Sequence, residues 1–229
     1  MNVQLNEVER RVLGVLIEKA LSQPQYYPMT VNAVVVACNQ KSNRDPEMNL
    51  DEDTVWNTLE ALRERGLAAR LLPGGTSRVE RWKHEVKEAL GWEKPQRAVM
   101  AELLLRGPQT VGELRSRCTR MFPFESVEAV GAVLEALSQG AEPVVSPLPR
   151  AAGQSAVRYA HRLYSDAEWQ QLSRSAGATA APAASAPAAR TAGPEAPADI
   201  RAELAELRAE VRALAAQVAQ LQSRLSGSA

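Results

Sequence analysis

The sequence has few of the residues on which enzymes and metal sites depend. Its 229 residues include two cysteines and two histidines, and aromatic residues make up only 4%. Neither the cysteines nor the histidines form a close pair such as C-x-x-C or H-x-x-x-H, which is the usual spacing of zinc ligands. No serine or cysteine stands in a recognisable nucleophile motif, and two histidines supply little general-base capacity. We therefore predict that the protein is not an enzyme and needs neither a cofactor nor a metal ion.

The sequence also lacks an excess of positive or negative charge and has no long apolar segment. Basic and acidic residues number 27 each, so the formal net charge is zero, and no overall charge draws the chain to nucleic acid or to a membrane. No apolar run approaches the roughly 20 residues that a membrane helix needs. The sequence does not start with a signal-peptide pattern, and two cysteines are too few for a disulfide framework. We expect a cytoplasmic protein with no membrane contact.

What the sequence does contain is one pattern that occurs twice within residues 1–165. The segment Leu59-Glu60-Ala61-Leu62 recurs as Leu134-Glu135-Ala136-Leu137, and Arg81-Trp82-Lys83-His84 recurs as Arg158-Tyr159-Ala160-His161. Thr30 begins a segment with Cys38, as Thr110 does with Cys118, and the offsets of these three matches are 75, 77 and 80 residues. Each copy predicts three helices followed by a two-stranded hairpin, the order of a winged helix-turn-helix domain.

Local signals place these elements. Residue pairs at capping-box spacing, Asn6 with Glu9 and Thr110 with Glu113, predict two helix starts. Thr30 and Asp51 are expected to begin the second and third helices of the first copy, and the third helix of the second copy is expected at residues 126–138. The hairpins are expected from strands at 68–72 and 78–82, and at 144–146 and 157–160. The matched Trp82 and Tyr159 are expected to anchor the core beneath each hairpin.

The rest of the chain has a different composition. Residues 173–198 hold 12 Ala and 4 Pro, which predicts a linker without a stable fold. Beyond it, apolar residues alternate spacings of three and four, the pattern of a coiled-coil seam about 39 Å long. The alternative is an amphipathic helix that packs on its own chain. We favour self-association as a parallel homodimer through the seam, which consists of Ile200, Leu204, Leu207, Val211, Leu214, Val218, Leu221 and Leu225.

Taken together, these patterns predict a mostly α protein with small β-wings. We expect two tandem winged helix-turn-helix domains and a C-terminal coiled-coil helix. The first domain, or first repeat, covers residues 1–90, and the second repeat covers 91–165. An Ala/Pro-rich linker at 166–198 then leads to the coiled-coil helix at 199–226.

Two runs of sequence resemble a known family. Asn39–Pro46, followed by Met48-Asn49-Leu50, and Leu103–Thr110, continued by Gly112–Arg117, are similar to the signature of the YceH-like family of bacterial proteins. The resemblance covers about residues 3–165 and implies tandem winged-helix domains. The family is uncharacterised, so the resemblance implies no catalytic or ligand-binding residues.

DNA binding is the first hypothesis for a winged helix, because its third helix usually enters the major groove. The charges argue against that geometry here. Residues 51–65 hold two arginines against five acids, and residues 126–138 hold two acids and no basic residue. Acids repel the phosphates that supply most of the binding energy. Helices that enter the groove normally begin with Arg, Lys, Asn or Gln, whereas the first of these two begins with three acids. Neither third helix looks like a reader of the major groove.

Basic residues elsewhere could still contact a DNA backbone or a protein partner. The alternative is that they are solvated surface charges. The insert at residues 39–46, which has no counterpart in the second repeat, is the best single candidate for a site, although turn formation also explains its Asn, Ser and Asp residues. The candidate contact residues are Lys41, Asn43, Arg44, Arg78, Arg81, Lys83, Arg115, Arg117 and Arg120.

The sequence thus leads to two hypotheses of function. The first is a non-catalytic, DNA-associated or regulatory protein, acting as a homodimer on double-stranded DNA. The second is a scaffold that docks protein partners without DNA, as tandem winged-helix subunits of chromosome-organising complexes do. The acidic third helices favour the second hypothesis, and the usual function of the fold favours the first.

Overall fold

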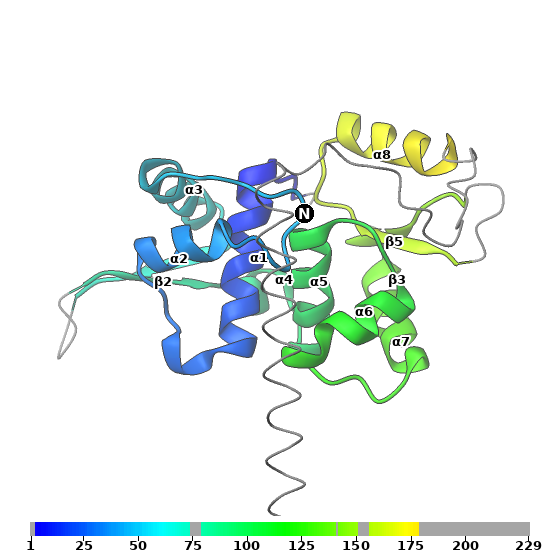
Figure 1. The fold of residues 1–229 in the computed structure, drawn as a ribbon, viewed down its shortest axis with the longest axis horizontal. Helices are drawn as coiled ribbons and strands as arrows, with labels where there is room; N and C mark the ends of the chain where they lie inside the picture. The colour runs from blue at the N-terminus through cyan, green and yellow to red at the C-terminus, as the bar shows by residue number, and fades with distance from the viewer. Residues whose placement is uncertain (1–2, 74–78, 141, 151–155, 179–229) are drawn as a thin grey trace, which may run out of the picture. The chain divides into compact units, whose positions relative to one another are not determined.

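The computed structural model describes residues 3–73, 79–140, 142–150 and 156–178, which are mostly helical with two small antiparallel sheets (Figure 1). The first repeat contains α1 (Glu7–Ser22), the short 3-10 helix η1 (Pro24–Tyr26), α2 (Val31–Cys38), α3 (Glu52–Glu64), β1 (Ala68–Leu71) and β2 (Arg81–His84). After α4 (Val86–Leu90), the second contains α5 (Lys94–Arg106), β3 (Gln109–Thr110), α6 (Val111–Arg117), η2 (Cys118–Arg120), α7 (Val127–Ser138), β4 (Val145–Pro147) and β5 (Arg158–His161). The last described element is α8 (Asp166–Ala178).

Helix α1 is the element on which both repeats pack. Every residue from Glu9 to Lys19 is buried, with α2 and α3 on one side of the helix and α5 on the other (Figure 1). At Gly14 the two helices approach closely, since a Cβ there would lie 3.0 Å from the side chain of Leu105 and 3.1 Å from Cβ of Leu104. The absence of a side chain on Gly14 therefore allows one hydrophobic core to continue from the first repeat into the second.

The helix starts expected from the sequence are confirmed. Asn6 accepts a hydrogen bond from Glu9 N at 2.9 Å, and the Glu9 carboxylate accepts one from Asn6 N at 2.8 Å. A second reciprocal pair joins Thr110 and Glu113. The side chain of Asp51 caps α3 by accepting a single hydrogen bond from Thr54 N at 2.7 Å, without a return bond. Each cap satisfies backbone N–H groups that the first turn of a helix leaves without partners.

The two hairpins are present, with a shift in one strand. In the first repeat β1 pairs with β2 from Ala68↔His84 to Leu71↔Arg81, so the second strand lies about three residues later than 78–82. This register turns Trp82 and His84 into the core. In the second repeat β4 pairs with β5.

The sequence patterns missed a third strand. In the second repeat β3 pairs with β5 through Gln109↔Tyr159. In the first, Met29 forms an isolated bridge with Trp82. The paired positions are equivalent, because Met29 and Gln109 each directly precede the threonine that caps the second helix. Both hairpins thus pair with the residue that precedes the second helix. This equivalence is further evidence that the two halves of the chain share one plan.

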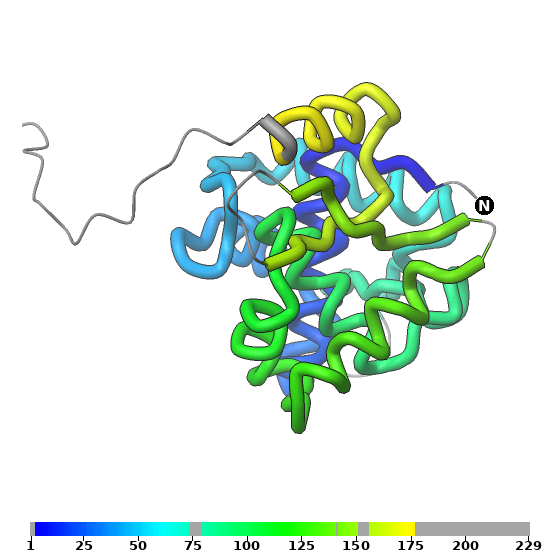
Figure 2. Tube along the Cα trace, turned by 90° about the vertical axis from the view of Figure 1, so that its right-hand side faces the viewer, coloured from blue at the N-terminus to red at the C-terminus, as the bar shows by residue number. Residues whose placement is uncertain are grey.

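The first part of the expected linker is a helix instead. Helix α8 begins with a reciprocal cap between Ser165 and Glu168, and Glu168 receives two hydrogen bonds from Arg10 of α1, at 2.7 and 3.2 Å. The guanidinium of Arg162 lies 4.0 Å from the ring centre of Trp169. Figure 2 shows α8 beside the start of α1. The sequence held a local signal for this helix, because Ser165 and Glu168 stand at capping-box spacing.

The remaining linker and the predicted coiled coil, residues 179–226, lie outside the described residues. Within the described ranges, no helix is long and apolar enough to cross a membrane.

A substitution at Gly14 tests the close packing of α1 and α5. We expect Gly14→Ala to lower the free energy of unfolding by about 1 kcal/mol, because overpacking costs about 1–3 kcal/mol and exceeds the gain in helix propensity. Gly131→Ala is the matched control in α7, where an added Cβ meets nothing within 4 Å; it should raise stability by up to about 1 kcal/mol. Equal stabilisation of both variants in denaturant unfolding would contradict the proposed close approach.

Candidate functional site

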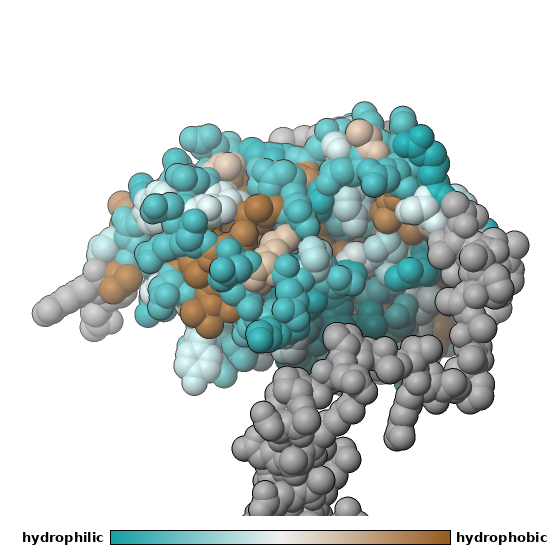
Figure 3. Space-filling view, turned by 45° about the horizontal axis from the view of Figure 1, so that its top comes forward, coloured by the Kyte–Doolittle hydropathy of each residue, from teal (hydrophilic) through white to brown (hydrophobic). Residues whose placement is uncertain are grey.

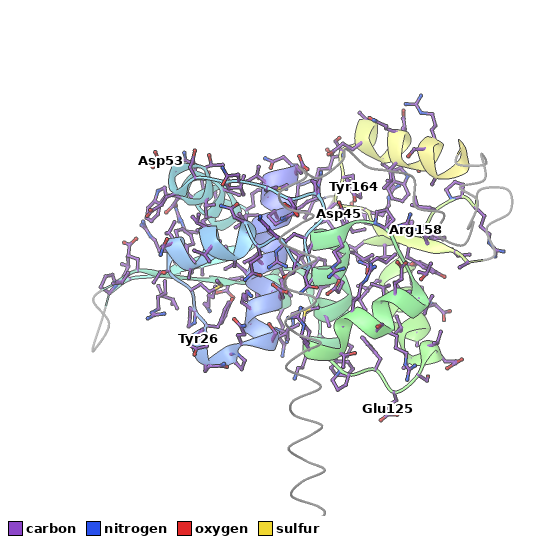
Figure 4. All side chains as sticks on the ribbon, in the orientation of Figure 1. Tyr26, Asp45, Asp53, Glu125, Arg158 and Tyr164 are labelled. Atoms are coloured by element: carbon purple, nitrogen blue, oxygen red, sulfur yellow. The ribbon has the colours of Figure 1, made fainter. Side chains whose placement is uncertain are left out.

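The beginning of α3 presents an acidic surface to solvent. Asp51, Glu52 and Asp53 are all exposed, and Figure 4 shows Asp53 at the outer edge of the molecule. Hydrogen bonds from Thr54 to the Asp51 carboxylate hold its pKa below the usual value. With Trp56, these three acids line a shallow surface hollow of about 600 Å³. The Asp51 carboxylate therefore remains ionised at neutral pH, and all three carboxylates are accessible to a partner.

Trp56 connects this acidic surface to the hairpin. Its ring lies edge-on to the buried Trp82 of β2, with the ring centres 5.7 Å apart. The guanidinium of Arg70 lies 5.8 Å from the centre of the Trp56 ring and pairs with Glu60 at 3.2 Å. Trp56 is consequently held in one orientation while remaining half-exposed beside the acids.

Exposed apolar side chains also gather in the first repeat. In the space-filling view, hydrophobic surface is concentrated over one side of the molecule (Figure 3). Of the six large apolar residues exposed in the described chain, five lie between residues 26 and 79, and the sixth is Val127 of α7. The five are Tyr26, Val36, Leu71, Leu72 and Val79.

The basic residues expected near the first hairpin have partners within the protein. Arg81 donates a hydrogen bond to the backbone oxygen of Pro28 at 2.9 Å, and Lys83 forms an ion pair with Glu85 at 2.7 Å. The third expected residue, Arg78, lies outside the described residues. In this hairpin the described cations are therefore at least partly satisfied by their own chain.

The basic residues of the second repeat are similarly engaged. Arg117 pairs with Glu113 at 3.2 Å. Arg115 donates to the backbone oxygen of Glu125 at 3.0 Å, and the exposed Arg120 lies 3.7 Å from the carboxylate of Glu18. These residues lie on α6 and η2, on the opposite side of α1 and α5 from β2 (Figure 1). The structure does not bring the two groups of cations together into one surface.

Arg44 of the insert is not available to a partner. Its side chain is buried, and its guanidinium lies 2.6 Å from the equally buried carboxylate of Glu18. Two further hydrogen bonds join it to the backbone oxygens of Ala37 and Asn43. The expectation that Arg44 contacts DNA or a partner conflicts with this burial. A signal was present in the sequence, because Glu18 is a single acid within an apolar stretch of α1 and requires a buried cation.

The rest of the insert joins the two repeats. Asp45 N donates to the backbone oxygen of Leu105 at 2.9 Å, and Arg106 of α5 donates to the side chain of Asn43. Asn43 adopts a left-handed backbone with φ of 60°, which asparagine tolerates better than most residues. Lys41 is exposed and is the one expected contact residue of the insert that remains accessible.

The matched cysteines and histidines lie in the core. Cys38 and Cys118 are buried free thiols, and burial raises the pKa of Cys38 to about 12. Burial likewise lowers the pKa of His84 to about 4 and that of His161 to about 3, so both imidazoles are neutral at pH 7. No group of three or more His, Cys, Asp and Glu residues in the described chain is arranged to hold a metal ion.

Comparison with known proteins identifies relatives over most of this region. The family described as "Protein of unknown function, DUF480" matches residues 5–154. A UPF0502 protein of Geotalea daltonii is 53% identical over 160 residues, 70% of this chain and 72% of the relative. UPF0502 proteins of Pelobacter propionicus and Geobacter sulfurreducens are 50% and 46% identical, over 72% and 77% of this chain and 75% and 80% of their own lengths.

The buried pair of Glu18 and Arg44 leads to a prediction about stability. We expect Arg44→Met to lower the free energy of unfolding by about 3–5 kcal/mol, because it leaves the Glu18 carboxylate buried without its closest partner. Replacing both residues with Glu18→Leu and Arg44→Met should cost less than Arg44→Met alone. The control is Arg63→Met, which removes an exposed pair with Glu60 and should cost less than about 1 kcal/mol. Equal costs for Arg44→Met and Arg63→Met in denaturant unfolding would refute the role of the buried pair.

Proposed function

The chain belongs to the DUF480 family of proteins of unknown function, and we propose that it is a non-catalytic protein of two winged-helix domains that docks a protein partner. The docking surface is the acidic beginning of α3 with the apolar residues around it. The observation that carries the proposal is the trio of exposed carboxylates, Asp51, Glu52 and Asp53, on the helix that DNA-binding winged helices insert into the major groove.

The order and pairing of elements support the winged-helix part of the proposal. In each repeat, three helices precede a hairpin, and a residue just before the second helix pairs with the second hairpin strand. A winged helix is built in this order, with the third helix presented to a binding partner and the hairpin as its wing. On this basis α3 and α7 are the recognition helices.

The electrostatics of these helices favour a protein over DNA. The acids at the start of α3 repel a phosphate backbone, and α7 adds the exposed acids Glu128 and Glu135. The cations expected to offset them are largely engaged in bonds within the chain, as Lys83 and Arg117 are. A DNA-binding surface needs unpaired cations directed outward, and α3 presents the opposite charge.

The same surface indicates the chemistry of the partner. Exposed carboxylates attract lysine and arginine side chains, and the partly exposed Trp56 offers an aromatic face to a cation or an apolar side chain. Leu71, Leu72 and Val79 extend the apolar surface along the hairpin. A segment with alternating basic and apolar side chains fits these features, in the way that amphipathic helices dock on complementary surfaces.

A peptide-binding experiment tests the docking surface. We expect the full chain to bind a fluorescent amphipathic Lys/Leu peptide and not the matching Glu/Leu peptide. The double variant Glu52→Lys with Asp53→Lys should weaken binding by about tenfold or more, because attraction becomes repulsion. The control variant, Glu125→Lys with Glu128→Lys, makes the same change in charge near the start of α7 and should bind as the unmodified protein does.

Random duplex DNA in a salt series provides the opposing test. The proposal predicts that the unmodified protein does not bind duplex DNA, even at low salt. If the unmodified protein binds duplex DNA with affinity that falls linearly with log salt, and the Lys/Leu peptide does not bind, the DNA-associated function replaces the docking function.

Self-association through the C-terminal seam is a separate part of the proposal, supported by the heptad spacing of Ile200 to Leu225. We expect the full chain to have the mass of a dimer in light scattering. Leu207→Pro interrupts the helix and should reduce the mass to that of a monomer. A full chain that is already monomeric at tens of micromolar rules out the dimer.

A further inference from the structure

A cavity of about 140 Å³ lies between α8 and the hairpin that β4 and β5 form in the second repeat. Helix α8 is fixed at its beginning, by the hydrogen bonds of Glu168 with α1 and by the contact of Trp169 with Arg162. Further along the helix, the half-buried Leu172 and Ala176 line the cavity. The second half of α8 is therefore separated from the hairpin by a space that no described side chain fills.

One face of the hairpin forms the opposite wall of the cavity. Leu148 N donates to the backbone oxygen of Arg158 at 2.8 Å, so these two residues are paired and their side chains lie on the same face. Arg150 follows Leu148 by two residues and lies on that face as well. All three residues line the cavity, and Figure 4 shows Arg158 in the hairpin below α8. The wall thus joins a buried leucine to two exposed arginines.

Arg158 is held in place by an interaction that both repeats share. Its guanidinium donates to the backbone oxygen of Pro108, which also lines the cavity. The matched Arg81 donates to Pro28, and each proline stands two residues before the threonine that caps the second helix. The plan of the repeat therefore positions one cation of the cavity. The other, Arg150, has neither an ion pair nor a hydrogen bond within the described ranges.

The accessible charges of this lining are positive. Arg150 and Arg158 are both exposed, and no acid is among the described residues that line the cavity. Glu113 interacts electrostatically with Arg158 but lies outside the lining and is already paired with Arg117 at 3.2 Å. Two cations on one face repel each other, and an anion bound between them replaces that repulsion with attraction. The lining therefore selects an anion.

The two cations and the apolar walls narrow the class of anion. A phosphate monoester carries nearly two negative charges and presents three acceptor oxygens, so it matches the charge of two guanidinium groups and can bond to both. A carboxylate carries half that charge. The remaining walls, which include Leu148, Pro149 and Leu172, favour an apolar body on the rest of the ligand.

We propose that this cavity binds a small organic phosphate, a phosphate monoester on an apolar body. The phosphate oxygens accept hydrogen bonds from Arg150 and Arg158, and the apolar body lies against Leu148 and Leu172. Because the walls come from α8 and from the hairpin, the bound ligand holds the second half of α8 on the hairpin. The site is independent of the docking surface on α3, and either proposal can fail without the other.

Calorimetry on the full chain tests the class of ligand, with phenyl phosphate as the probe. Phenyl phosphate should bind saturably and at least about threefold more tightly than inorganic phosphate, because its ring buries apolar surface. It should exceed benzoate by a similar factor, because it carries more charge. Phenol has the same ring without the charge and should give no saturable heat. If phenyl phosphate does not bind, or binds no more tightly than inorganic phosphate, benzoate or phenol, the assignment is wrong.

A variant of Arg150 locates the binding. Arg150 is exposed and has no partner within the described ranges, so Arg150→Gln should leave the fold intact and weaken phenyl phosphate binding by about tenfold. Arg174→Gln is the matched control, because it removes the same charge from an exposed position of α8 outside the lining. The control should change binding by less than about threefold. Equal affinities of the two variants, weakened or not, would show that Arg150 has no special contact and would refute the site.

Hydrogen exchange on the unmodified protein avoids any dependence on variants. Saturating phenyl phosphate should slow the exchange of the backbone amides in the second half of α8 by about threefold or more, because the ligand joins this half to the hairpin. The amides of α3 serve as the control and should slow less. Saturable binding that slows α3 as much as α8, or leaves α8 unchanged, would exclude a ligand between α8 and the hairpin.

Discussion

The fold depends on satisfying the charges of one buried helix. Helix α1 is buried from Glu9 to Lys19, although five of those eleven residues carry charge. A buried charge without a partner costs several kcal/mol, so each needs a counterion or hydrogen bonds from a neighbouring element. Glu18 forms an ion pair with Arg44 of the insert, and Arg10 forms one with Glu168 of α8. Glu9 forms an ion pair with Arg65 at the end of α3. The charges of α1 thus account for the position of three other segments.

These partnerships explain which parts of the structure the sequence could predict. A cap such as Asn6 with Glu9 joins residues three apart, so local spacing is enough to identify it. The pair of Arg10 and Glu168 joins residues 158 apart, and no local pattern indicates it. Strand β3 was missed for this reason, since it is fixed by pairing with the distant β5, whereas the start of α8 had a local signal in the spacing of Ser165 and Glu168 that was overlooked. Arg44 was misassigned because basic residues in a polar loop usually face solvent.

The two repeats share a plan but differ in the surface that they present. The first exposes acids at the start of α3 and most of the exposed apolar side chains, whereas α7 exposes small residues such as Ala132 and Ala136 beside its two acids. The sequence alone indicated the acidic character of α3. It could not indicate that Trp56 lies beside those acids, because the ring is oriented by Trp82, which comes from the hairpin. The two copies therefore keep one order of elements while exposing different side chains on their third helices.

The two thiols have a consequence for how motion in this molecule can be followed. Each repeat contains one cysteine, and burial keeps both protonated at neutral pH by raising their pKa. Only the thiolate reacts with alkylating reagents, so modification requires that the surrounding helices first separate and admit water. The alkylation rates at Cys38 and Cys118 therefore report how often the first and the second repeat, respectively, unfold locally.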